Sequence, residues 1–279
     1  MAESLVQLYP TAFVTGASAG LGRAFVDMLL QEGVRVWGTS RDTVRLTDLA
    51  SRNPASFTPV VLDLARAAEA EAAFTRAARY AGGGFDLVIN NAGYGVFGGF
   101  DQVEFAAWQT QLDAMLGTTL RLAQAALRGM RARGRGCLVN VASLAVEFPL
   151  PLMAGYNVAK AGLSALSESL IFETRGTGIS VIDFRPGDYR TDFNTSMHAV
   201  SPAASGSAAA RIWQQLERSL RAGPPPARAA ADLRRALLRR RSGTVRSGSF
   251  FQARLAPFLA RIAPSSWRRT VMAKYFGGN

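Results

Sequence analysis

Short apolar runs alternate with longer amphipathic segments over the first two-thirds of the chain. Six runs have the character of strands, at 12–14, 34–37, 59–62, 87–89, 138–141 and 181–184. Between them, apolar residues recur at helical spacing, as Leu21, Phe25, Met28 and Leu29 do within 21–32. Uninterrupted apolar strands are typical of sheets buried on both faces. The pattern predicts an α/β fold with a doubly wound, mostly parallel sheet covered by helices on both sides.

The alternation stops after Phe184. A Pro/Gly/Ser/Ala-rich stretch covers 186–210, and helical patterns follow at 211–222 and 227–240. We interpret 186–225 as a substrate lid, because a long irregular segment at the ligand-facing edge of such a sheet is more often functional than not; an ordinary surface loop is the alternative. We expect 250–279 to cap the domain. No shift in composition marks a linker, so we expect 1–279 to form a single domain.

Composition limits the chemistry. Cys137 and His198 are the only residues of their types, so we expect neither a disulfide framework nor a Cys/His metal site. The start of the chain has no basic segment followed by an apolar stretch, and no run of 18 uncharged apolar residues occurs. We therefore expect a cytoplasmic protein without a spanning helix.

The net charge of +12 is concentrated at one end. Residues 1–210 hold 17 Lys and Arg against 18 Asp and Glu, whereas 211–279 hold 15 against 2. Three interpretations are open: a solvated arginine-rich face, a peripheral contact with anionic lipid, or a surface for anionic substrate or nucleic acid. No nucleic-acid-binding motif accompanies the charge, so we do not expect nucleic acid as a partner.

Glycines mark the turn after the first strand, in the segment Thr15-Gly16-Ala17-Ser18-Ala19-Gly20-Leu21-Gly22. Glycines in this context permit a tight turn, let a pyrophosphate approach the backbone and let the helix pack closely, while the helix N-terminus attracts negative charge. The spacing resembles the Thr-Gly-x-x-x-Gly-x-Gly motif of the short-chain dehydrogenase/reductase family. The resemblance extends over about residues 10–250 and implies a Rossmann sheet of about seven strands.

The resemblance also implies where a dinucleotide would bind. In the family, the residues after the third, fourth and sixth strands meet the adenine, the adenosine side and the nicotinamide carboxamide. Asp63 alternatively caps the helix that follows it. The cofactor-binding residues expected on this basis are Gly16, Ser18, Gly20, Leu21, Gly22, Asp63, Leu64, Asn91, Ala92, Gly93, Tyr156, Lys160, Pro186, Gly187 and Thr191.

The end of the second strand decides which nicotinamide cofactor fits. A carboxylate there would accept bonds from the ribose hydroxyls, but this chain has Ser40 and Arg41. A guanidinium beside a hydroxyl can hold a phosphate through two hydrogen bonds. We therefore expect Ser40 and Arg41 to bind the 2′-phosphate of NADP(H).

Tyr156 and Lys160 form the candidate proton-transfer pair. A phenol ionises poorly near neutral pH unless a cation lies close, and positions i and i+4 share one helical face. The chain has 30 Arg and two Lys, so a lysine at this position is notable. Ser143, thirteen residues earlier, can orient a substrate oxygen. The resemblance implies that Ser143, Tyr156 and Lys160 are the catalytic residues.

One position departs from the family pattern. Many members have Asn three residues before a Gly-Thr pair, where it supports a water relay to the lysine, and this chain has Ala114. A backbone carbonyl can replace it, so we expect NADPH-dependent reduction of a lipophilic ketone or aldehyde, or the reverse reaction. The alternatives are a non-catalytic NADP-binding sensor or scaffold and, ranked lower, a sugar-nucleotide epimerase or dehydratase.

Two apolar segments bear on substrate and partners. Residues 144–153, with Tyr94, Val96 and Phe97, are expected to line the pocket, with core packing as the alternative.

The C-terminal segment resembles the hydroxysteroid and retinol dehydrogenase-like members. Its apolar residues fall near one helical face that could lie on a membrane, cover the pocket or pack on a second subunit, and Pro257 is expected to start or kink this helix. We favour the last two and expect a homodimer or homotetramer. These apolar residues are Phe251, Leu255, Phe258, Leu259 and Ile262.

Overall fold

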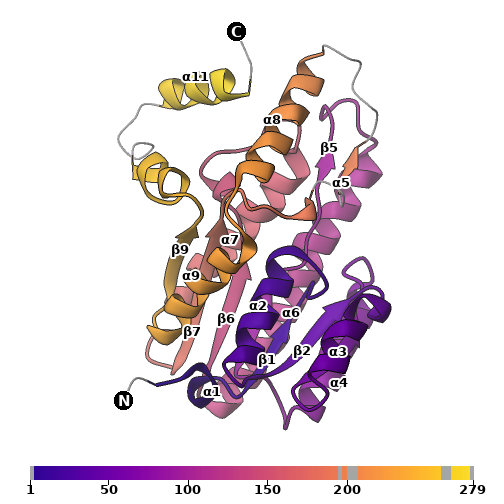
Figure 1. Cartoon of the computed structure of the whole chain (residues 1–279), viewed down its shortest axis with the longest axis vertical. Helices are drawn as coiled ribbons and strands as arrows, with labels where there is room; N and C mark the ends of the chain where they lie inside the picture. Colours follow the sequence, from indigo (N-terminus) through magenta and orange to yellow (C-terminus); the bar gives the residue numbers. More distant parts are fainter. Residues whose placement is uncertain (1–2, 194–196, 200–206, 259–264, 277–279) are drawn as a thin grey trace.

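A parallel sheet of seven strands forms the centre of the protein, as expected (Figure 1). The computed structural model describes residues 3–193, 197–199, 207–258 and 265–276. The strand order is β3-β2-β1-β4-β6-β7-β9, and all neighbouring pairs are parallel. The strands are β1 (Thr11–Val14), β2 (Arg35–Ser40), β3 (Phe57–Val61), β4 (Leu87–Asn90), β6 (Gly136–Val141), β7 (Ile179–Pro186) and β9 (Gly243–Ser247).

The six strands expected from sequence are present, with ends displaced by at most three residues. The seventh, β9, pairs with β7 at the sheet edge. Its sequence, Gly-Thr-Val-Arg-Ser, is polar and half-buried, so it carries no uninterrupted apolar run. A second, two-stranded pairing joins β5 (Val96–Phe97) to β8 (His198–Ala199).

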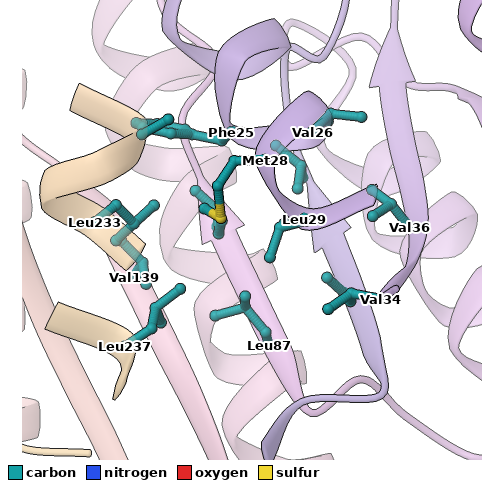
Figure 2. Close-up of a cluster of buried hydrophobic side chains, with 14 of the residues drawn as sticks. Phe25, Val26, Met28, Leu29, Val34, Val36, Leu87, Val139, Leu233 and Leu237 are labelled. Carbon is teal, nitrogen blue, oxygen red and sulfur yellow. The ribbon is translucent and has the colours of Figure 1, made fainter. Parts of the chain in front are cut away.

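Helices cover both faces of the sheet. One face packs on α2 (Gly20–Gln31) and α9 (Pro226–Leu238), and Figure 2 shows Phe25, Met28 and Leu29 of α2 beside Leu233 and Leu237 of α9. The other face packs on α4, α6 and α7. The remaining helical segments up to β7 are α1 (Leu5–Leu8), η1 (Thr43–Leu46), α3 (Thr47–Arg52), α4 (Ala67–Tyr80), α5 (Phe105–Leu112), η2 (Asp113–Thr118), α6 (Thr119–Arg133), η3 (Leu144–Val146) and α7 (Ala154–Glu173).

Alternation within β1 shows how one strand serves both layers. Ala12 and Val14 belong to the cluster under α2 and α9, whereas Phe13 points to the opposite face. There its ring centroid lies 4.9 Å from that of Phe74 and 5.1 Å from that of Phe85. Because both faces of the strand are buried, Ala12, Phe13 and Val14 are all apolar and do not alternate with polar residues.

The expected lid begins inside the sheet, because β7 continues to Pro186. The helical pattern at 211–222 is confirmed as α8 (Ala208–Ala222), which starts earlier because the Ser207 Oγ accepts a hydrogen bond from the Ala210 N–H at 3.1 Å. The pattern at 227–240 is confirmed as α9. Residues 194–196 and 200–206 of the lid lie outside the described part of the chain.

The C-terminal segment is helical on both sides of a gap in the described residues. A wide π-type turn, η5 (Phe251–Leu255), continues as helix to Phe258, and α11 (Ser265–Tyr275) follows. Pro257 therefore lies within the helix and does not start it, because the wider turn precedes the residue that lacks an N–H. Leu259 and Ile262 fall outside the described residues. Within the described segments, no helix is long and apolar enough to cross a bilayer.

Candidate active site

The turn between β1 and α2 is built for close backbone approach. Gly16 has φ +70°, and a Cβ on Gly22 would lie 2.0 Å from the Gly16 carbonyl oxygen, so no larger residue fits. The Thr15 Oγ accepts hydrogen bonds from the N–H groups of Asn91 (2.8 Å) and Ala92 (3.0 Å). The Asn91 side chain donates back to the Thr15 carbonyl at 2.9 Å. Thr15 thus joins the glycine turn to the end of β4.

The N-terminus of α2 is available to an anion. Its N-cap is Ala19, no side chain caps it, and no acidic residue stands in its first turn. Its first N–H groups therefore have no intrahelical acceptor. Ser18, Gly20 and Leu21 lie at this end, and Gly20 adopts φ +55°. This cradle fits the pyrophosphate of a dinucleotide.

The end of β2 lies at the same edge of the sheet. Ser40 is buried and its Oγ accepts a hydrogen bond from the Asp42 N–H at 3.3 Å, whereas Arg41 is exposed. Arg41 and Asp63 both act on Tyr94: burial raises the pKa of its phenol, Arg41 lowers it and Asp63 raises it further. The strand ends expected to hold the adenosine half therefore come together.

Asp63 closes the turn before α4 and is not the N-cap of that helix, which begins at Ala67 with Arg66 as its N-cap. The Asp63 Oδ1 accepts a hydrogen bond from the Ala65 N–H at 3.0 Å. The next carbonyl, that of Leu64, accepts one from the Thr118 Oγ at 2.7 Å. Thr118 closes η2, so the end of β3 is fixed to the helix that carries Ala114.

Ser143, Tyr156 and Lys160 meet at the ends of β6 and α7. Ser143 is a buried N-cap whose Oγ accepts a hydrogen bond from the Ala145 N–H at 3.0 Å, and its side chain also bonds the Tyr156 hydroxyl. Lys160 is 6% exposed, and its Nζ lies 5.7 Å from the Tyr156 ring centroid. The same Nζ donates to the Val141 carbonyl at 2.6 Å. The three expected catalytic residues therefore form one cluster.

The protonation equilibria of the pair differ from the sequence-based expectation. Burial raises the pKa of the Tyr156 phenol, the hydrogen bond with Ser143 opposes the rise, and the charge of Asp188 adds to it. Burial lowers the pKa of Lys160 to about 8, against an opposing effect of Asp183. Lys160 does not oppose the rise, because its lowered pKa leaves it uncharged in the pH range in which the phenol ionises.

A buried ion network lies under this cluster. Asp183 on β7 is fully buried and accepts hydrogen bonds from the Ser164 Oγ and the Arg185 Nε, both at 2.7 Å. Arg185 also pairs with Glu147 at 2.9 Å, and Arg246 of β9 reaches the same carboxylate at 2.6 Å. The network fixes the segment after Ser143 to two strands. From the sequence, the only indication of this network was that Asp183 and Arg185 interrupt the apolar residues of β7.

The segment after β7 reaches the site from another side. The Gly187 N–H donates to the Ser247 carbonyl at 2.7 Å, which joins the expected nicotinamide-binding residues Pro186 and Gly187 to β9. A Cβ on Gly187 would lie 2.8 Å from the Gln252 Oε1. Thr191 lies beside the glycine turn, since a Cβ on Gly20 would meet its Cγ2 at 3.5 Å. Gln252 was not expected at the site, because only the folding of η5 against the segment after β7 brings its side chain to Gly187.

Apolar side chains enclose Tyr156. Its ring packs edge-on against Phe193, with centroids 5.7 Å apart. The same cluster includes Phe97, Leu150, Leu152 and Met153, which were expected in a pocket wall, and residues of α8 and α11. Tyr94 and Val96 instead pack in a separate cluster with Trp108, which is the core-packing alternative.

The helix carrying Ala114 is interrupted beside the site. Over Asp113–Thr118 the backbone forms a π-type turn, and Ala114 within it is buried. A Cβ on Gly93, at the end of β4, would lie 3.1 Å from Met115 and 3.8 Å from the Lys160 Nζ. Met115 of the wide turn and the Lys160 Nζ thus both lie beside Gly93, and turns of this kind often mark functional sites.

A parallel sheet with a glycine cradle and a buried Ser/Tyr/Lys cluster at one edge defines a dinucleotide-binding oxidoreductase. The short chain dehydrogenase family model matches residues 10–201, and the chain belongs to this family. Its members act as oxidoreductases on CH-OH and C=O groups, and this chain is such an enzyme.

Individual proteins are similar over most of the chain. An uncharacterized oxidoreductase of Myxococcus xanthus is 35% identical over 197 residues, which cover 70% of this chain and 78% of the relative. The crystal structure of a short-chain dehydrogenase from Streptomyces avermitilis superposes with a TM-score of 0.79 at 27% identity, covering 94% of this chain and 96% of that one. A metagenomic short-chain oxidoreductase in complex with NADP gives 0.66 at 28% identity, covering 85% and 96%.

Proposed function

We propose that the enzyme reduces a lipophilic ketone or aldehyde with NADPH, or runs the reverse reaction, with Tyr156 as its proton-transfer group. The observation that carries the proposal is the setting of Tyr156. Its hydroxyl bonds Ser143, while its ring belongs to an apolar cluster with Phe193 and Met153. A carbonyl compound with apolar substituents fits such a site, because the polar groups converge on its oxygen and the rest of it meets hydrocarbon.

The roles of the residues follow from this arrangement. When bound, the reduced nicotinamide supplies the hydride to the carbonyl carbon. The Ser143 hydroxyl donates to the carbonyl oxygen and orients it, and the Tyr156 hydroxyl gives its proton to the same oxygen as negative charge develops. The raised pKa of Tyr156 keeps the phenol protonated, as an acid requires. The apolar wall excludes water from the reacting carbon.

The proton on Tyr156 must be replaced after each turnover. We propose that a water held by a main-chain carbonyl of η2 near Ala114 passes it through Lys160, so that the usual Asn is not required. The lowered pKa of Lys160, about 8, suits a group that gives and regains a proton near neutral pH.

The preference for NADPH rests on Ser40 and Arg41. Arg41 is exposed at the end of β2, and no carboxylate pairs with it among the described residues. Its guanidinium can meet a 2′-phosphate, and the nearest carboxylate, that of Asp42, is engaged as the cap of η1 by the Val44 N–H at 2.9 Å. The related oxidoreductase solved with NADP agrees with this preference.

The experiment is a screen of NADPH oxidation against aromatic, steroidal and fatty ketones, followed by Tyr156→Phe with the best substrate. We expect kcat to fall by about 10³-fold in the variant, with NADPH binding and the melting temperature retained. Tyr80→Phe, at an exposed tyrosine, is the matched control and should change nothing. Full activity of Tyr156→Phe would disprove the role of the phenol, and tight NADPH binding without turnover of any ketone would favour a sensor.

A further inference from the structure

The helix after β9 turns its apolar residues outward. Phe250, Phe251, Leu255 and Phe258 are 73%, 59%, 41% and 62% exposed. Positions 251, 255 and 258 follow one another at i, i+4 and i+7, so they share one face of the helix. A helix at the surface of a globular protein normally turns this face to the core. We call these four residues, together with the exposed Arg254 among them, the phenylalanine face.

The opposite side of the same helix is fixed to the protein. Gln252 donates from Nε2 to the Asp188 Oδ2 at 2.6 Å, and Pro257 is buried. The Gln252 Oε1 would lie within 3.3 Å of a Cβ on Gly248. Rotating the helix to bury its phenyl rings would break the bond to Asp188, so the outward orientation is built into the fold.

The last helix packs elsewhere. The Tyr275 hydroxyl and the Ser219 Oγ lie 2.6 Å apart, and Phe276 is buried against Leu216 of α8. The exposed fractions given above hold with α11 present, so α11 does not cover the phenylalanine face. Figure 1 shows the helix after β9 beyond the edge of the sheet, which ends with that strand.

The charged residues that follow Asp232 in the sequence, Arg254 of this face among them, are all positive. No Asp or Glu follows Asp232 in the sequence, while 11 Lys and Arg do. Arg254 lies within the face and pairs with no carboxylate of the described residues, and Arg269 and Lys274 of α11 are exposed. Exposed aromatic rings with the cationic Arg254 among them are complementary to a membrane surface, whose acyl chains are apolar and whose headgroups are anionic.

We propose that the phenylalanine face docks on an anionic lipid bilayer. The phenyl rings enter the boundary between headgroups and acyl chains, and Arg254 meets lipid phosphates. A second copy fits the face less well, because a two-fold interface would bring each Arg254 and its cationic surroundings against the same surface of the partner. Docking would bring the catalytic site close to the bilayer, since Gln252 reaches the Gly187–Asp188 segment from the same helix.

The full-length chain is tested by co-sedimentation with vesicles of phosphatidylcholine alone and of phosphatidylcholine with phosphatidylglycerol. We expect binding to the anionic vesicles that weakens with added salt. The double variant Phe251→Ser/Phe258→Ser should lose affinity by at least about tenfold, and Arg254→Ser should weaken binding to the anionic vesicles in particular. Turnover of a water-soluble ketone should be unchanged in these variants, which separates this test from that of the enzymatic function.

Phe172→Ser is the matched control, because Phe172 is 70% exposed on α7 with Arg175 over its ring at 5.2 Å. It has the same residue chemistry on another surface and should not affect vesicle binding. Melting temperatures establish that each variant folds, and the single substitutions replace the double variant if that one does not. Absence of binding to anionic vesicles, or equal binding by the double variant, would overturn the proposal. Self-association or RNA binding that the double variant abolishes, without vesicle binding by the parent chain, would overturn it in favour of that partner.

Discussion

Gln252 and Asp188 are joined by two hydrogen bonds. The Gln252 Nε2 donates to the Asp188 Oδ2 at 2.6 Å, and its Oε1 accepts from the Asp188 N–H at 3.4 Å. A residue near the end of the chain thereby holds a carboxylate whose charge acts on Tyr156. Because that charge disfavours the phenolate, it contributes to the raised pKa of the phenol.

Asp188→Asn should lower the pKa of Tyr156. Ketone reduction needs the protonated phenol, so its rate is lost as pH rises through this pKa. The alkaline limb of kcat/KM for reduction should therefore move to lower pH, as should the acid limb of the reverse reaction, which needs the phenolate. Asp42→Asn, at an exposed carboxylate, should leave the profile in place. A limb that moves upward in Asp188→Asn would contradict the assignment.

Lys160→Met should stabilise the protein while it abolishes turnover. Folding lowers the pKa of Lys160 from 10.5 to about 8. A lysine with a lowered folded-state pKa destabilises the fold fully below that value, and the penalty fades as pH rises toward the unfolded value. The penalty is about 3 kcal/mol, against about 1.5 kcal/mol for the lost bond to the Val141 carbonyl.

The unfolding free energy of Lys160→Met at pH 7 should thus rise by about 1 to 2 kcal/mol, and the gain should shrink as pH rises from about 8 toward 10.5. Urea denaturation at several pH values measures it. The exposed Lys274→Met is the control, with no change expected. A loss of stability at every pH would show that the hydrogen bond outweighs the buried charge.

Asp183→Asn should destabilise the fold. The variant removes the charge that accepts from Ser164 and Arg185. The guanidinium of Arg185, 11% exposed, keeps its pairing with Glu147, a longer one with the exposed Glu168 and its bond to the Ser164 Oγ. Removing one partner of a buried ion pair costs about 3 kcal/mol. Because Asp183 raises the pKa of Lys160, the variant should also lower that pKa further.

Urea denaturation and a pH profile measure these two effects of Asp183→Asn. Asp27→Asn, in a half-exposed pair with Arg23 on α2, should cost less than about 1 kcal/mol. Equal stabilities of the two variants would show that the network is not what holds the segment after Ser143.

Arg41→Ala should change cofactor preference. If its guanidinium binds the 2′-phosphate, the KM for NADPH should rise by at least about tenfold and that for NADH should stay nearly constant. The neighbouring exposed Arg45→Ala controls for loss of positive charge alone. If the KM values for NADPH and NADH rose by the same factor, or if neither changed, Arg41 would not be the source of an NADPH preference.

The sheet could be predicted because its strands are apolar throughout. Phe13 packs on one layer while Ala12 and Val14 pack on the other, so a run of consecutive apolar residues indicates that both faces are buried. The strand β9 could not be recognised in this way, because its pairing with β7 depends on an edge position where Thr244 and Arg246 stay half-exposed. Its place is set by tertiary contacts and not by local sequence.

The glycine turn and the Tyr156–Lys160 pair could be predicted because their spacing is local to a turn or a helix, whereas Ser143 was expected from the resemblance to the family. Gln252 could not, since 64 residues separate it from Asp188 and no periodicity connects them. The sequence also did not predict that the pKa of Tyr156 is raised. Sequence places an ammonium four residues away, but only the structure shows that the Lys160 Nζ bonds the Val141 carbonyl and that Asp188 lies near the phenol.

The packing of α2 against α9 has a consequence for synthesis. Phe25 and Leu29 belong to an early helix, yet Leu233 and Leu237 near the other end of the chain complete their cover (Figure 2). Arg234 also bonds Glu32 at 2.7 Å across the same contact. A nascent chain released from the ribosome only as far as β7 carries an uncovered hydrocarbon surface. Chaperone capture should therefore be strongest for that intermediate and end once α9 emerges.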